Sequence, residues 1–170
     1  MNKLNIAALS LALLACGCSA GGEAAYDQKS APQAPEFTLA TVPPGTFRLA
    51  ERRGKVLLLE FMSYNCPACD GANAPLVELH RKYEAKGFGV VAVSIDADSD
   101  MAGYAKRYGL NYPIALDIEQ KAAMDYRLRG TPSFVLIDKQ GKIRRHWAGF
   151  APELIPFMES SIEQLLQEPA

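Results

Sequence analysis

The chain has 170 residues, of which 49% are apolar, and its 18 Lys and Arg nearly balance its 19 Asp and Glu. This length corresponds to one domain with some additional chain, and the apolar share is sufficient for a sizeable core. The net charge of −1, with no basic run longer than a pair such as Arg52-Arg53, argues against a nucleic-acid surface.

The first residues, MNKLNIAALSLALLACGCSA, have the pattern of a targeting segment. Lys3 gives a positive start, and the apolar run over residues 4–15 is too short to cross a bilayer as a helix. The run ends in LLAC, which resembles the lipoprotein box of bacteria. This resemblance implies a lipoprotein-type signal segment over residues 1–18, with lipidation of Cys16 or, alternatively, of Cys18.

An ordinary secretory signal, cleaved after Ala20, is the alternative interpretation. Both interpretations take the protein out of the cytoplasm, to the periplasmic or outer face of a membrane of the bacterial cell envelope, where disulfides form. Residues 19–35 are small and polar, contain proline and have no periodicity, so they predict a flexible tether. The folded domain is expected over residues 36–168.

The first predicted elements lead to a pair of cysteines. Residues 36–50 contain two alternating runs, EFTLA and TFRLA, around TVPPG, which predicts a leading β-hairpin. The run KVLLLEF over residues 55–61 is typical of a strand covered on both faces. Residues 67–86 have apolar side chains at helical spacing and end before Gly87. Pro75 is expected to kink this helix.

The remaining chain alternates strands and helices. Predicted strands cover residues 89–96, 112–117, 133–138 and 142–149, and predicted helices cover residues 99–109, 119–128 and 152–167. Only KQG separates the last two strands, which predicts a hairpin. This order predicts an α/β fold whose central sheet has one antiparallel edge.

Cys66 and Cys69 fall where the first central strand ends and a helix begins. Active groups of open α/β sheets gather at that end of the strands. The unpaired N–H groups and the positive dipole end of a helix start stabilise a thiolate, which is the reactive form of cysteine. Cys66 is therefore expected to be exposed and to attack, and Cys69, more buried, to resolve the mixed disulfide.

Other uses of the pair are less well supported. Structural zinc needs four ligands, but besides the signal-region cysteines only His80 and His146 remain, at no ligand-like spacing, and both are interpreted as solvated. Covalent haem needs His directly after Cys69, where the chain has Asp70. We expect no metal and no cofactor beyond a redox-active disulfide. A purely structural disulfide is the remaining alternative.

The stretches PEFTL, GKVLLLEF, CPAC, VVAVSID, YPIALD, RGTPSFVLID and GKI carry a family resemblance. From about residue 36 to residue 166, the chain resembles the thioredoxin-like thiol–disulfide oxidoreductases of the TlpA/ResA kind. The resemblance implies a thioredoxin fold: a mixed central sheet flanked by helices, with an N-terminal β-hairpin extension. It also implies Cys66 as nucleophile, Cys69 as resolving cysteine and Pro132 as the family's cis-proline. The backbone of Thr131 is then expected to pair with an extended substrate segment.

Glu60 lies six residues before Cys66, at the position of the buried acid of thioredoxin. A carboxylate within VLLLEF is costly to bury, so its pKa is expected to be raised. The functional interpretation is a proton acceptor for Cys69 during resolution. The alternative is a structural acid paired with a nearby Lys or Arg.

The chain departs from the family pattern beside the cysteines. Asn65, preceded by Tyr64, stands where a Trp is usual, and Pro67 begins the spacer between the cysteines. These three residues are expected to contribute to the substrate-binding surface. Asp70 places a negative charge near the thiols and is expected to oppose thiolate formation.

The sequence therefore predicts a lipid-anchored, extracytoplasmic thiol–disulfide oxidoreductase that exchanges a Cys66–Cys69 disulfide or dithiol with protein partners. The resemblance favours reduction of a partner's disulfide, for example in apocytochromes that await haem attachment. A membrane thiol-reductase is the expected electron donor, and no nucleic-acid partner is expected.

Two alternative functions stay open. A thiol peroxidase of the peroxiredoxin kind has Pro seven residues and Thr or Ser three residues before its reactive Cys; Ser63 fits, but Leu59 stands where Pro is needed. A copper-binding chaperone of the related fold usually spaces its cysteines one residue wider and adds a His.

Overall fold

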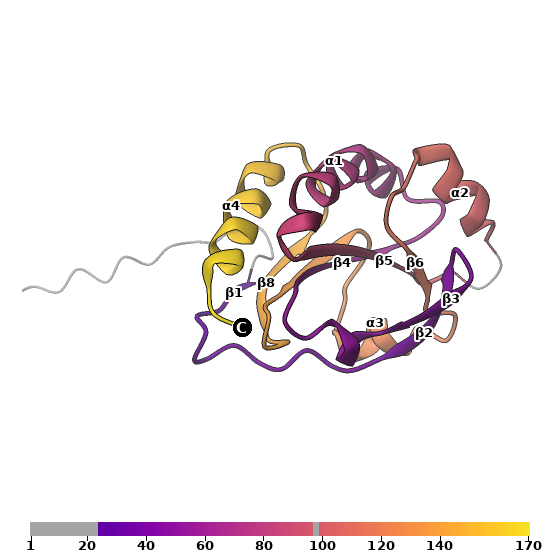
Figure 1. The fold of residues 1–170 in the computed structure, drawn as a ribbon. Coiled ribbons are helices and arrows are strands. Elements are labelled where there is room, and N and C mark those ends of the chain that lie inside the picture. Colours follow the sequence, from indigo (N-terminus) through magenta and orange to yellow (C-terminus); the bar gives the residue numbers. More distant parts are fainter. Residues whose placement is uncertain (1–23, 97–98) are drawn as a thin grey trace, which may run out of the picture.

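The computed structural model describes residues 24–96 and 99–170, which form a central sheet with helices on both faces (Figure 1). The strands are β1 (Ala24–Ala25), β2 (Thr38–Val42), β3 (Gly45–Arg48), β4 (Val56–Met62), β5 (Phe88–Ser94), β6 (Ile114–Leu116), β7 (Ser133–Ile137) and β8 (Ile143–Ala148). Their order across the sheet is β1-β8-β7-β4-β5-β6-β2-β3. The sheet is mixed, as predicted, because β4, β5 and β6 run parallel and the other pairings are antiparallel.

The helices divide between the two faces. Three of them, α1 (Pro67–Tyr83), α2 (Met101–Tyr108) and α4 (Leu154–Gln167), share an apolar cluster with one face of the sheet. The short helix α3 (Lys121–Asp125) and the 3-10 helix η1 (Leu49–Arg52) pack with the other face. A second 3-10 helix, η2 (Glu84–Lys86), follows α1 and ends at Gly87, whose φ of 93° is one that glycine adopts readily.

Strand β4 lies near the middle of the sheet and is buried along its whole length. Its side chains alternate between the faces. Val56, Leu58 and Met62 belong to the cluster with α1, whereas Leu57, Leu59 and Phe61 belong to the cluster on the opposite face. Glu60 therefore points to the same face as α1, and β4 delivers both this acid and the following cysteine pair to one region of the protein.

The predicted signal segment, with Cys16 and Cys18, lies outside the described residues, as do residues 19–23 of the predicted tether. In the part of the chain that the structure describes, no helix has the length and apolar character needed to span a membrane.

The remainder of the predicted tether is not flexible chain but part of the folded domain. β1 pairs with β8, and the Ala34 N–H donates to the Gly141 carbonyl at 2.9 Å. The Ile143 N–H donates to the Pro32 carbonyl, also at 2.9 Å. The physical reason is that β8 would otherwise be an edge strand with unpaired backbone groups, which the segment over residues 24–35 satisfies.

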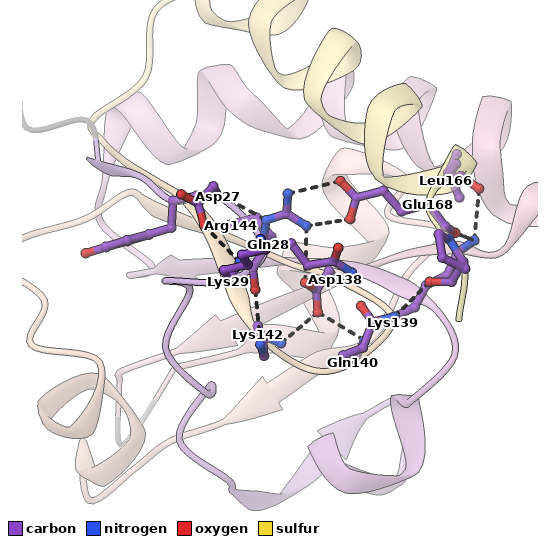
Figure 2. A network of polar contacts seen from close by, with 12 residues as sticks. Asp27, Gln28, Lys29, Asp138, Lys139, Gln140, Lys142, Arg144, Leu166 and Glu168 are labelled. Atoms are coloured by element: carbon purple, nitrogen blue, oxygen red, sulfur yellow. Dashed lines mark hydrogen bonds and ion pairs between the residues drawn. The ribbon is translucent and has the colours of Figure 1, made fainter.

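Side chains of the sheet also hold this N-terminal segment (Figure 2). Arg144 is buried; its guanidinium forms ion pairs with Asp138, at 3.3 Å, and with Glu168, at 2.6 Å. Its Nε donates to the carbonyl of Tyr26 at 3.2 Å, and Lys142 Nζ donates to the carbonyl of Gln28 at 3.1 Å. One buried cation thus connects the N-terminal segment, the β7–β8 turn and the end of the chain.

Candidate active site

Cys66 and Cys69 form a disulfide at the start of α1, with their Cα atoms 5.2 Å apart. Cys66 is the N-cap residue, Pro67 follows in the first helical turn, and the Cys69 N–H donates to Cys66 Sγ at 3.2 Å. Proline suits this place because the first N–H groups of a helix have no intrahelical partner. The helix start therefore directs its unpaired donors and its positive dipole end at the Cys66 sulfur.

The two cysteines differ in exposure, but less than the sequence predicts. Only 8% of the surface of Cys66 is exposed, so the prediction that this residue is exposed is wrong. Cys69 is fully buried, so it is the more buried of the two, as predicted. Cys66 belongs to the apolar cluster that α1, α2 and α4 share with one face of the sheet, which accounts for its low exposure. Its neighbours Asn65 and Pro67 are exposed, so the chain beside Cys66 lies at the surface.

The segment before β7 lies at the same end of the sheet as the disulfide. Phe61 of β4 pairs with Ser133 of β7, which places Thr131 and Pro132 next to the end of β4. The Thr131–Pro132 peptide bond is cis, as the family resemblance implies. The hydroxyls of Ser63 and Thr131 lie 3.3 Å apart, so the segments on either side of the site are in direct contact.

Glu60 is buried to 1% exposure, and neither of its carboxyl oxygens has a hydrogen-bond partner among the described residues. Burial raises the pKa of Glu60 to about 8. The expected raised pKa thus agrees with the structure, whereas the alternative of a Lys or Arg partner is wrong for the described part of the chain. Burial and then the charge of Glu60 raise the pKa of Tyr112, which places that phenol in the same buried region.

A hydrogen-bonded chain behind the cysteines was not predicted. The Tyr104 hydroxyl of α2 donates to Asp70 Oδ1 at 2.9 Å and accepts from Asn73 Nδ2 at 2.8 Å. Tyr104 and Asn73 are both buried. Tyr104 lies in the helix predicted over residues 99–109, but its polar role was missed. The available signal was the pair of polar residues Asp70 and Asn73, three apart near the start of α1.

Tyr64 connects the active-site loop to the same region. Its ring lies 5.8 Å from that of Tyr104, which in turn lies 4.6 Å from that of Tyr108. The backbone N–H of Tyr64 donates to Asp96 Oδ2 at 2.6 Å. Asp96, two residues after β5, is thus a second residue that sequence reasoning missed, and it fixes the loop that precedes Cys66.

The histidines are less solvated than the sequence predicts. His80 is 7% exposed and its ring packs edge-on against Tyr112, with centroids 5.9 Å apart. His146 is partly buried on β8, on the opposite face of the sheet from α1. Both positions correct the interpretation of these residues as solvated.

Comparison with known proteins places the chain in a family. The chain belongs to the AhpC/TSA family, which matches residues 31–146. Thiol-disulfide oxidoreductase ResA of Bacillus anthracis is 31% identical over 112 residues, which make up 65% of this chain and 65% of that protein. ResA of Halalkalibacterium halodurans is 28% identical over 130 residues, 75% of this chain and 74% of the relative.

A solved structure from Chlorobium tepidum, assigned as the thiol:disulfide interchange protein DsbE, is 30% identical and superposes with a TM-score of 0.77. The superposition covers 80% of this chain and 96% of that protein. The thioredoxin fold and the resemblance to the TlpA/ResA kind are thereby confirmed.

Proposed function

We propose that the protein is a thiol–disulfide oxidoreductase that exchanges its Cys66–Cys69 disulfide or dithiol with protein partners. The observation that carries the proposal is the unequal setting of the two sulfurs: Cys66 caps a helix and keeps some surface, whereas Cys69 has none. A partner reaches Cys66 first, and the helix start stabilises the thiolate of that residue in the reduced protein. The names of the ResA relatives support this activity.

In the reducing direction, the Cys66 thiolate attacks one sulfur of a partner disulfide and releases the other as a thiolate. Cys69 then loses its proton, attacks the Cys66 sulfur and releases the second partner thiolate. The products are the Cys66–Cys69 disulfide and a partner dithiol, so two electrons pass to the partner. An electron donor has to reduce the protein again before the next cycle, and a membrane thiol-reductase fits that role.

Glu60 is the proposed proton acceptor for Cys69 in the second step. Its side chain points to the face of the sheet on which Cys69 lies, and its pKa of about 8 is close to the ordinary pKa of a thiol, roughly 8.5. Proton transfer between groups of similar pKa requires little free energy in either direction. An ordinary exposed Glu would be too weak a base for this purpose.

The proposed setting is the bacterial cell envelope, with a lipid anchor at Cys16 or Cys18. The targeting pattern of residues 1–18 supports an extracytoplasmic location, and a compartment that permits disulfides suits the exchange chemistry. Disulfide-containing proteins of that compartment, apocytochromes among them, are the proposed partners. Mass spectrometry of the native N-terminal peptide tests the anchor: a lipidated Cys16 or Cys18 supports it, and an unmodified N-terminus at Gly21 refutes it.

The activity is tested by insulin reduction with dithiothreitol as the electron donor. The wild-type protein should accelerate insulin reduction, and Cys66→Ala should abolish the acceleration. Hydrogen peroxide serves as the competing substrate, because a thiol peroxidase would consume it rapidly. Peroxide turnover without insulin reduction would overturn the proposal, although Leu59, buried within β4 where that family has Pro, argues against this result.

A further inference from the structure

A cavity of about 440 Å³ lies on the face of the sheet opposite α1. Its floor consists of two cross-strand pairs of β7 and β8, Ser133 with Ala148 and Val135 with His146. Directly opposed residues share one face of a sheet, and Val135 belongs to the cluster on the far side from the disulfide helix. The volume is within the range of ligand pockets, roughly 300–1,000 Å³.

The walls of the cavity carry positive charge and no negative charge. Arg127 and Arg129, which follow α3, line one side, and Tyr26 and Pro32 of the N-terminal segment line the other. Neither arginine forms an ion pair with another residue in the described ranges, and none of the lining residues is acidic. Two unpaired guanidinium groups at one opening favour an anionic ligand, and a carboxylate fits their donor geometry.

Arg127 has a φ of 54°, in the left-handed region where glycine is favoured. This conformation is common in the residue that follows a helix, and here it ends α3: the Arg127 N–H donates to the Met124 carbonyl at 2.9 Å and the Leu128 N–H donates to the Ala123 carbonyl at 3.2 Å. The conformation holds Arg127 at the cavity wall, beside Tyr126, whose hydroxyl is held by the Pro35 carbonyl at 3.0 Å.

His146 provides a polar group at the floor. Its Nε2 is buried and has no hydrogen-bond partner among the described residues. A buried polar atom of this kind is normally satisfied, so the His146 ring leaves an unmet hydrogen bond beneath the cavity floor. Burial lowers the pKa of His146, so the ring is neutral at neutral pH. A neutral imidazole has one N–H, which donates a hydrogen bond.

The cavity adjoins the exchange site through the backbone. Ser133 of the floor directly follows Pro132, and Ala148 precedes Gly149, whose N–H donates to the Pro132 carbonyl at 2.8 Å. A partner segment extended beside Thr131 advances roughly 3.3 Å per residue. A side chain two or three residues from the partner's reactive cysteine is then displaced by roughly 7–10 Å along the segment, toward the residues that flank Pro132.

We infer that this cavity, lined by Arg127, Arg129 and His146, binds an acidic side chain of the partner, two or three residues from the cysteine that Cys66 attacks. This inference rests on the proposed exchange function and deepens it, because it assigns a chemical preference to the partner. The carboxylate lies between the two guanidinium groups, above the floor to which His146 contributes.

The test uses full-length reduced protein in detergent and two synthetic peptides. Each peptide carries one cysteine in a disulfide with thionitrobenzoate. The positions two and three residues before and after that cysteine are all Glu in one peptide and all Gln in the other. The wild-type protein should react roughly three- to ten-fold faster with the Glu peptide, a ratio that shrinks at high salt. The double variant Arg127→Gln/Arg129→Gln should bring the ratio close to one. Arg127→Gly, which suits the backbone, should lower it.

Arg48→Gln is the control for the loss of an exposed positive charge elsewhere: it removes one such charge, which is paired with Glu51, from β3 at the far edge of the sheet. This variant should keep the wild-type ratio. A wild-type ratio of one, or an unchanged ratio in the double variant, would overturn the inference.

A binding measurement separates this inference from the exchange function. Fluorescence anisotropy of labelled peptides with Ala in place of Cys reports affinity without any exchange. Tighter binding of the Glu peptide by the wild type, lost in the double variant, supports the cavity even if no peptide is reduced. Equal affinity for both peptides overturns the cavity even if exchange is fast.

Discussion

The hydroxyl of Tyr104 donates a 2.9 Å hydrogen bond to Oδ1 of Asp70, the residue directly after Cys69. The same hydroxyl accepts from the buried amide of Asn73 at 2.8 Å. One phenol of α2 therefore fixes two polar side chains of α1 immediately behind the disulfide. The Tyr104 hydroxyl thus helps to hold the charged group next to the cysteines.

Tyr104→Phe should lower the free energy of unfolding by roughly 1–3 kcal/mol, because it leaves the buried Asn73 amide without this partner. Urea melts of the oxidised proteins measure the change. Tyr108→Phe is the comparison variant: it removes the hydroxyl of a less buried tyrosine one turn later on α2, which also interacts with Asp70. It should change stability less, because Asn73 keeps its partner. Equal stability of Tyr104→Phe and the wild type would show that the hydrogen-bonded chain contributes nothing.

Glu60 should destabilise the protein increasingly as pH rises. Its folded-state pKa of about 8 exceeds the ordinary value of 4.5, so the folded state retains a proton that the unfolded state releases between these values. The stability contributed by the protonated acid is complete below pH 4.5 and is lost as pH rises through 8. Glu60→Gln removes this loss and should be more stable at pH 7, by on the order of 3 kcal/mol.

Denaturant melts of the wild type and Glu60→Gln at a series of pH values check this sign. The gain of the variant should be small near pH 4.5, should grow toward pH 8 and should then level off. A variant that is less stable than the wild type at pH 7 would mean that Glu60 is a structural acid with a favourable partner.

The same substitution should slow disulfide exchange. Without Glu60, Cys69 has no local base, so insulin reduction near pH 7 should slow by roughly 10- to 100-fold. The deficit should shrink at alkaline pH, where Cys69 ionises unaided. Rates measured from pH 6 to pH 10 test this, and an equal rate for variant and wild type at pH 7 would remove Glu60 from the mechanism.

Arg144 should contribute strongly to holding residues 24–35 against the rest of the domain. Arg144→Met leaves the buried carboxylate of Asp138 without its cation and should cost about 3–5 kcal/mol of stability. Arg145→Met is the control, because the neighbouring side chain is more exposed and makes one hydrogen bond to a backbone carbonyl. Limited proteolysis within residues 24–35 should be faster in the first variant, and equal cleavage in both would contradict the role of Arg144.

The sequence was a good guide where patterns are local. The apolar run KVLLLEF predicts β4, and the proline after Cys66 predicts the start of α1. Both signals come from residues that are adjacent in the sequence. The position of Glu60 within such a run likewise predicts its burial. The mixed sheet flanked by helices followed from the alternation of elements together with the family resemblance.

The sequence was a poor guide where contacts join distant residues. Two-residue β1 exists because β8 offers an unpaired edge, and nothing in residues 24–35 alone signals this pairing. The hydrogen bond between Tyr104 and Asp70 joins α2 to α1, and these two residues are 34 positions apart in the sequence. Cys66 is covered by residues that the fold brings together, so its low exposure was not predictable from the helix start.

The division of labour between Cys66 and Cys69 is the central claim, and trapping partners in intact cells tests it most directly. Full-length Cys69→Ala and Cys66→Ala are produced in separate cultures, thiols are blocked by acid and alkylation, and disulfide-linked partners are identified by mass spectrometry. Cys69→Ala should accumulate mixed disulfides on Cys66, because the attacker is present and the resolving thiol is absent. Cys66→Ala should accumulate none, because fully buried Cys69 does not meet a partner. Mixed disulfides on Cys69 in the Cys66→Ala protein, at a yield equal to that of Cys69→Ala, would contradict the assignment.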